Sequence, residues 1–198
     1  KNSKEDDKGV KNYFTLAKKY HLKSNIVYTS SGAVYGKQPK KLLKIKDNQV
    51  LDIKQKTSKS KRNYALQKID NEKIFQKLSS YGIKVSIARC FAFVGKNLPL
   101  EKNYVVGNFI HSVLGKKEII IKSNIKVIRS YMHADDLADC LLRLVFDNTT
   151  NFGTYNIGSD KPVDIFRLGT FLSNKYKVKC IRLKQTIHNN EDRYVPSI

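Results

Sequence analysis

The stretch Asn25-Ile-Val-Tyr-Thr-Ser-Ser-Gly-Ala-Val-Tyr-Gly36 decides the fold class of this chain. An apolar run is followed by three hydroxyl side chains and then by a turn that contains glycine. This pattern predicts a buried strand that delivers Ser30 and Ser31 to one end of a sheet.

A second segment, Tyr64-Ala-Leu-Gln-Lys68, lies in a helix that we expect over about residues 63–80. Tyr64 and Lys68 are four residues apart and therefore share one face of that helix. An ammonium group held near a phenol favours the phenolate, which is a base. Ser31, Tyr64 and Lys68 together predict a proton-transfer site, in which the serine holds a substrate oxygen and the tyrosine exchanges its proton.

The two segments, TSSGAVYG and YALQK, resemble the extended short-chain dehydrogenase/reductase family of NAD(P)-dependent nucleotide-sugar epimerases, dehydratases and reductases. The spacing of Tyr64 and Lys68 alone is a weak signal in a lysine-rich chain. Three later segments follow in the family's order, so that the resemblance covers nearly the whole chain: RCFAFVG (89–95), RSYMHADDLA (129–138) and YNIGSD (155–160).

The resemblance implies NAD or NADP as cofactor and a nucleotide sugar as substrate. It assigns catalysis to Ser31, Tyr64 and Lys68, which would also contact the cofactor, while Ser31 and Tyr64 would contact the substrate. Phe91 matches an aromatic residue near the nicotinamide; an exposed turn residue is the alternative interpretation.

Two arginines are candidates for substrate binding. Arg129 matches the family's arginine that grips the nucleotide diphosphate, for which a planar fork of donors is suited. Arg193 lies in the tail 185–198, where family members return to the substrate pocket, and either contacts phosphate or is solvated.

An epimerase or 4-ketoreductase is the leading hypothesis. Dehydratases of the family carry an Asp-Glu pair just after the serine strand, and decarboxylases carry a glutamate in the same turn, where this chain continues with Gly32.

The family's glycine-rich turn, which cradles the cofactor pyrophosphate, has no counterpart in these 198 residues. We therefore expect a fragment of such an enzyme, or a chain whose cofactor half comes from another polypeptide. The alternatives are a catalytically inactive remnant or partner subunit and, less favoured, a basic nucleic-acid-binding module.

The net charge of +21 is the feature that raises the nucleic-acid alternative. Its lysine clusters, residues 37–46 and 54–62, lack interleaved aromatic residues, and lysine far outnumbers arginine, the better reader of bases. We interpret most of this charge as solvated surface, part of which attracts an anionic substrate. Nucleic acid is therefore an unlikely partner.

Cysteine usage and hydropathy point to the cytoplasm. Cys90, Cys140 and Cys180 lie far apart without metal-ligand spacing, and we expect buried or partly buried free thiols and no metal site. No run of about 18 apolar residues occurs, and the N-terminus is charged, so neither a membrane span nor a signal peptide is predicted.

Alternating strands and helices predict an α/β fold, a partial Rossmann-like parallel sheet with a smaller substrate-binding portion. We expect residues 1–96 to form the C-terminal half of the Rossmann-like domain, and 97–198 to form mainly the substrate-binding portion, with about 126–160 returning to the sheet.

Asp135 or Asp136 should cap the helix 134–146, His133 should be structural, and the YNIG turn should matter through its backbone. The resemblance also implies a homodimer through the Tyr64 helix.

Overall fold

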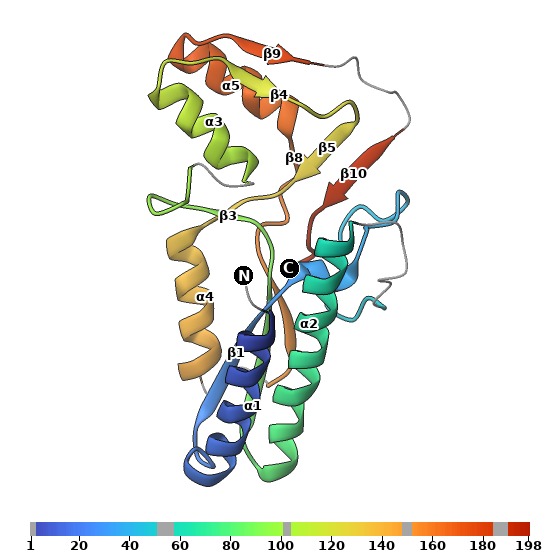
Figure 1. The fold of residues 1–198 in the computed structure, drawn as a ribbon, viewed down its shortest axis with the longest axis vertical. Coiled ribbons are helices and arrows are strands. Elements are labelled where there is room, and N and C mark those ends of the chain that lie inside the picture. The colour runs from blue at the N-terminus through green and yellow to red at the C-terminus, as the bar shows by residue number, and fades with distance from the viewer. Residues whose placement is uncertain (1–2, 51–57, 101–103, 148–151, 184–189) are drawn as a thin grey trace.

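The computed structural model describes residues 3–50, 58–100, 104–147, 152–183 and 190–198. Figure 1 shows a larger part, with long helices around a parallel sheet, and a smaller part of short strands and helices above it. Among the described residues, no helix is both long enough and apolar enough to cross a membrane.

The larger part is built on a parallel sheet of order β1-β2-β7, formed by Asn25–Ser31, Lys84–Cys90 and Thr154–Ile157. Helices α1 (Ser3–Tyr20) and α2 (Lys59–Gln76) lie on one side of it and α4 (Ala134–Phe146) on the other (Figure 1). Successive residues of a strand point to opposite faces. Ile26 and Tyr28 accordingly pack with Phe75 of α2, while Val27 packs on the α4 side. The predicted α/β class and parallel sheet are confirmed.

The smaller part contains two short sheets. In one, β5 (Lys126–Arg129) lies between the parallel β10 (Glu191–Tyr194) and the antiparallel β8 (Val163–Asp164). In the other, β4 (Ile119–Ile121) pairs with β9 (Cys180–Arg182). Helices α3 (Val105–Leu114) and α5 (Ile165–Tyr176) contribute Phe109 and Ile165 to its core.

Short elements connect the two parts. Strand β3 (Phe93–Val94) leaves the end of β2 and pairs with β6 (Met132–His133), which leads into α4. Of the segment 126–160, α4 and β7 belong to the larger part, whereas β5 belongs to the smaller one. The domain boundary near residue 97 stays a prediction.

Helix boundaries differ from the sequence-based expectation where side chains cap them. Helix α2 begins at Lys59 because the Ser58 side chain accepts a hydrogen bond from the Lys61 amide (3.4 Å). It continues as a 3-10 helix (η2, Lys77–Tyr81) and ends at Gly82, whose φ of 78° is left-handed.

The cap expected for α4 was wrong. His133, not an aspartate, is the capping residue, and its Nδ1 accepts a hydrogen bond from the Asp135 amide (3.3 Å). Asp135 and Asp136 follow the cap within the first turn, where a carboxylate is favoured by the helix dipole.

A buried ion pair joins α2 to the sheet. Glu72 accepts hydrogen bonds from Arg89 Nε (3.0 Å) and Nη2 (2.7 Å), and from the Ser30 hydroxyl (2.5 Å). Arg89 Nη1 also donates to the Tyr35 hydroxyl (2.9 Å), which in turn donates to Asn156 (2.8 Å). Burial alone would lower the pKa of Arg89, but its bonds to Glu72 and Tyr35 leave that pKa raised.

Replacing Glu72 by alanine should lower the free energy of unfolding by about 3–5 kcal/mol, because Arg89 is left buried without its counter-charge. Urea unfolding followed by circular dichroism measures this change. The matched control is Asp70→Ala on the same helix, which removes the exposed pair with Lys73 (3.1 Å) and should cost at most about 1 kcal/mol. Equal losses of unfolding free energy in Glu72→Ala and Asp70→Ala would show that the Glu72–Arg89 pair stabilises the fold no more than an exposed pair does.

Candidate active site

The two serines of the strand have different surroundings. Ser30 is 5 % exposed and its hydroxyl is bonded to Glu72 inside the molecule. Ser31, the next residue, points to the other face, as strand geometry requires. Its side chain accepts a hydrogen bond from the Ala33 amide (3.2 Å), caps the 3-10 helix η1 (Gly32–Tyr35), and lies close enough to Tyr194 to lower the pKa of that phenol. Only Ser31 is therefore placed for contact with a substrate.

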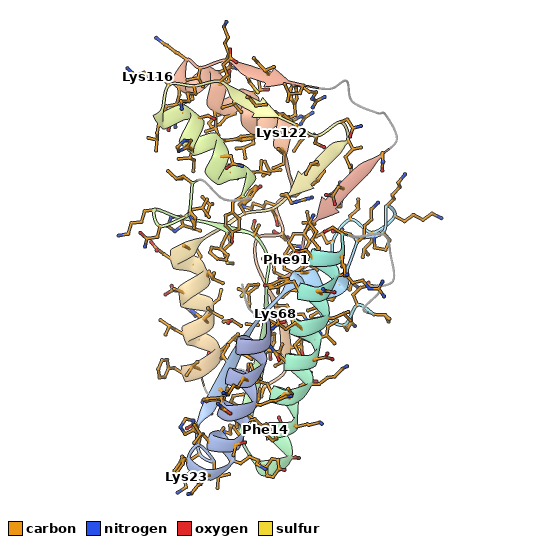
Figure 2. All side chains as sticks on the ribbon, in the orientation of Figure 1. Phe14, Lys23, Lys68, Phe91, Lys116 and Lys122 are labelled. Atoms are coloured by element: carbon orange, nitrogen blue, oxygen red, sulfur yellow. The ribbon has the colours of Figure 1, made fainter. Side chains whose placement is uncertain are left out.

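Tyr64 and Lys68 project from the N-terminal half of α2. The Tyr64 side chain is 46 % exposed and lines a cavity beside η1. Lys68 Nζ donates to the Thr29 carbonyl (3.0 Å) and lies 6.0 Å from the centre of the Tyr64 ring. Figure 2 shows Lys68 near the level at which the two parts of the molecule meet. The bond to Thr29 holds the ammonium group close to both Tyr64 and the end of the serine strand.

Tyr194 links these groups and was missed by the sequence analysis. It is the last residue of β10, and Ser31 and Tyr64 both lie near its hydroxyl. Burial raises the pKa of the Tyr194 hydroxyl, while the neighbouring Ser31 side chain lowers it and the neighbouring Tyr64 raises it. No local pattern marks Tyr194, because only the pairing of β10 with β5 brings it to this place.

Phe91 lies beneath Tyr194, with the two rings stacked at 4.5 Å between centres. Only 5 % of Phe91 is exposed, so the alternative of an exposed turn residue is wrong. Its position follows directly from the end of β2, whose last residue, Cys90, is in register with Ser31. Phe91 also lines the larger of two cavities at the site.

Two cavities meet at Arg129 and Tyr194. The larger, about 670 Å³, lies toward the smaller part and is lined mainly by aromatic and apolar side chains, among them Phe93, Tyr104, Val106 and Tyr131. The smaller, about 560 Å³, contains Tyr64 and is lined by several cations. Arg129, Tyr194 and Lys61 line both, so one extended ligand could reach from an apolar to a basic compartment.

The two predicted substrate arginines lie on neighbouring strands of this site. Arg129 Nη2 contacts Asp192 Oδ2 (2.6 Å), and Arg193 Nε contacts Glu191 Oε1 (2.7 Å). Arg193 is thus half-buried and ion-paired rather than solvated. The acid partners hold the two guanidinium groups in place, and each guanidinium group keeps further N–H donors for a ligand.

Asn156 corrects the interpretation of the YNIG turn as a backbone feature. Its side chain is buried, accepts from Tyr35 (2.8 Å) and donates to the Ile45 carbonyl (2.8 Å). The asparagine therefore connects β7 to the segment after η1, which supports the Ser31 turn.

The three cysteines are free and half-buried, as expected. No group of potential metal ligands occurs among the described residues. Burial raises the pKa of the Cys90 thiol to about 11, although the Lys68 charge opposes this. A thiol with that pKa is a weak nucleophile near neutral pH. Tyr64 and Lys68, not Cys90, are the reactive candidates at this sheet edge.

Comparison with known proteins agrees with this geometry. Residues 4–158 match the model of the NAD dependent epimerase/dehydratase family, which is more than half of the chain. The chain belongs to this family.

Curated relatives match a shorter stretch. UDP-glucuronic acid decarboxylase 3 of Arabidopsis thaliana is 33% identical over 79 residues, which cover 40% of this chain and 22% of the relative. The chain thus matches about a fifth of the length of this relative.

Solved structures of the family show the fold. A dTDP-glucose 4,6-dehydratase from Bacillus anthracis has a TM-score of 0.77 at 18% identity, covering 96% of this chain and 57% of the dehydratase. A UDP-glucose 4-epimerase from Thermotoga maritima also has a TM-score of 0.77 at 18% identity, covering 96% of this chain and 59% of the epimerase. The family fold is present over nearly all of this chain, which spans somewhat more than half of each structure.

Replacing Gly32 by alanine should disturb the contact between Ser31 and Tyr194. A Cβ at this position would lie 2.5 Å from the Tyr194 hydroxyl and 2.7 Å from the Phe91 ring. We expect a loss of about 1–3 kcal/mol in the free energy of unfolding, measured by urea titration. Gly9→Ala on α1 is the control: its Cβ meets nothing within 4 Å, and the change should stabilise by about 0.5–1 kcal/mol. A neutral Gly32→Ala would show that Tyr194 is not packed as described.

The raised pKa of Cys90 predicts a loss of stability at alkaline pH. The unfolded thiol ionises near pH 8.5 and the folded one at about 11, so the contribution is complete below about pH 8.5 and is lost as the pH rises toward 11. Over this range the loss should be on the order of 2–3 kcal/mol. Urea unfolding of the wild type and of Cys90→Ala tests this at about pH 8, below the pKa of the unfolded thiol, and at about pH 10.5, above it. Identical pH dependence in both proteins would show that Cys90 does not contribute.

Proposed function

We propose that this chain carries the catalytic and nucleotide-sugar-binding elements of an NAD(P)-dependent nucleotide-sugar epimerase or 4-ketoreductase. The observation that carries the proposal is the arrangement of Ser31, Tyr64 and Lys68 around Tyr194, where two cavities meet. Because the chain spans 57% and 59% of the two family structures, we propose that it is part of such an enzyme.

In the proposed mechanism, Tyr64 removes the proton from a sugar hydroxyl and later returns it. Lys68, anchored on the Thr29 carbonyl, holds its ammonium group 6.0 Å from the centre of the Tyr64 ring. Ser31, which lies beside Tyr194, binds the same sugar oxygen. A bound NAD(P) would supply hydride chemistry at the carbon that carries this hydroxyl.

The residues present fit one end of such a cofactor. The phenol of Tyr64 and the ammonium of Lys68 are a donor set suited to ribose hydroxyls, and Phe91 lies under Tyr194 in the wall of the adjoining cavity. No glycine-rich turn for a pyrophosphate occurs in the sequence. We therefore assign to this chain only the nicotinamide side of the cofactor site.

The packing of Gly32 supports an epimerase or reductase over a dehydratase. A side chain at Gly32 would collide with Tyr194 and Phe91, so an acidic residue has no room there. The turn that carries two carboxylates in dehydratases is filled here by the phenol of Tyr194.

Arg129 and Arg193 are the proposed ligands of the nucleotide diphosphate. Both line the Tyr64 cavity, and Arg129 also lines the apolar one, in which a nucleotide base would fit.

Homodimerisation through α2 and a cytoplasmic location stay predictions; three free thiols are typical of a reducing compartment.

Tyr64→Phe tests the proposal. With NAD⁺ and UDP-glucose, the wild-type chain complemented by a polypeptide that supplies the rest of the cofactor site should form the 4-epimer, followed by chromatography, and the variant in the same complex should be slower by about 10²–10⁴-fold. Its affinity for UDP-glucose, measured by calorimetry, should be unchanged within about threefold, because the diphosphate contacts remain. Tyr81→Phe, an exposed tyrosine in η2, is the matched control and should have full activity.

Three outcomes separate the alternatives. Equal turnover in the wild type and Tyr64→Phe removes the catalytic assignment. Binding of UDP-glucose without turnover by the complemented wild type favours the inactive partner subunit. A wild-type chain that binds no UDP-sugar overturns the proposed function.

A further inference from the structure

The cavity that contains Tyr64 is unusually rich in positive charge. Its cationic side chains come from four separate segments of the chain: Lys37 after η1, Lys61 and Arg62 on α2, Arg129 on β5 and Arg193 on β10. One acid, Asp192, lines the same cavity, and it is paired with Arg129 (2.6 Å).

These cations form two groups that differ in their partners. Arg129 and Arg193 have acids at 2.6 and 2.7 Å. Within the described part of the chain, Lys37, Lys61 and Arg62 have no carboxylate within ion-pair distance. Among the described residues, this second group is therefore available for an anion from a ligand.

The diphosphate of a nucleotide sugar does not account for two members of this second group, Lys37 and Arg62. A nucleotide base fits the apolar cavity, and Arg129, which lines both cavities, places the diphosphate at their junction. The sugar then enters the smaller cavity, where Tyr64 reaches its hydroxyl. Lys37 and Arg62 line only that smaller cavity, so they face the sugar.

We propose that the sugar of the substrate carries its own negative charge, as a carboxylate: the substrate is a nucleotide-linked uronic acid. This inference rests on the proposed function and specifies its substrate class. A carboxylate in place of the hydroxymethyl group of a hexose adds one charge without enlarging the ring, and its two oxygens match the planar fork of Arg62. The low-dielectric walls of a cavity concentrate the field of like charges and strengthen this attraction.

Each cation should add only a little to the preference for UDP-glucuronic acid over UDP-glucose, and the cations together should add more. An exposed ion pair contributes at most about fivefold in affinity, so two or three together should give about tenfold. Calorimetry with the purified 198-residue chain compares UDP-glucuronic acid with UDP-glucose. We expect about tenfold tighter binding of the uronate, and an advantage that shrinks at about 0.5 M NaCl, where exposed charges are screened.

Variants of the cavity wall test the assignment. Lys37→Gln with Arg62→Gln should reduce the preference for the uronate to about threefold or less, while the affinity for UDP-glucose stays the same. Lys23→Gln is the matched control, because Lys23 is an exposed lysine at the far end of the larger part, away from Lys68 and Phe91 (Figure 2). It should leave both affinities unchanged, which separates a specific site from general attraction to a chain of charge +21.

The outcomes distinguish this inference from the proposed function. Equal binding of UDP-glucose and UDP-glucuronic acid, or a preference that survives in the Lys37→Gln/Arg62→Gln variant, overturns the uronate inference and leaves the nucleotide-sugar proposal intact. Failure to bind either compound overturns both. A preference lost equally in Lys23→Gln also overturns the inference, because it would reflect only the net charge.

Discussion

Two buried charges, Glu72 on α2 and Arg89 on β2, hold the helix that carries Tyr64 and Lys68 against the sheet. Their side chains are 4% and 9% exposed, so each charge depends on the other for compensation. Glu72 follows Lys68 by four residues and Tyr64 by eight, along the same side of the helix. Sliding α2 by one turn would leave Arg89 buried and unpaired, which fixes the height of Tyr64 and Lys68 relative to the serine strand.

The same ion pair organises the segments around the site. Through Tyr35 and Asn156, Arg89 is connected to the Ile45 carbonyl, and Ile45 in turn exchanges backbone bonds with Val195 and Ser197. The Gln38 side chain also accepts a bond from the Val195 amide (3.0 Å). These bonds fasten the C-terminal tail to the loop after η1, and they hold Tyr194 and Arg193, which precede Val195, at the candidate active site.

Charge is distributed unevenly between the structural and the ligand-facing sides of this region. Below the sheet edge, each buried charge is paired and hydrogen-bonded, as the cost of burying an ion requires. At the cavity beside Tyr64, cations from four segments converge, and the one acid that lines it is already bonded to Arg129. Cations that converge in this way lower the stability of the fold and favour the binding of an anionic ligand.

Local sequence determined the elements and one part of the site. The apolar run 25–28 predicted the buried strand, and the four-residue spacing of Tyr64 and Lys68 predicted their common face, because both depend only on neighbouring residues. The tertiary structure decided the rest: which serine turns toward Tyr194, that His133 rather than Asp135 caps α4, and that Phe91 is covered. Tyr194 enters the site only because β10 pairs with β5, some sixty residues earlier in the chain. A pairing over that distance is set by packing and hydrogen bonding in the folded state, and no local pattern of residues contains it.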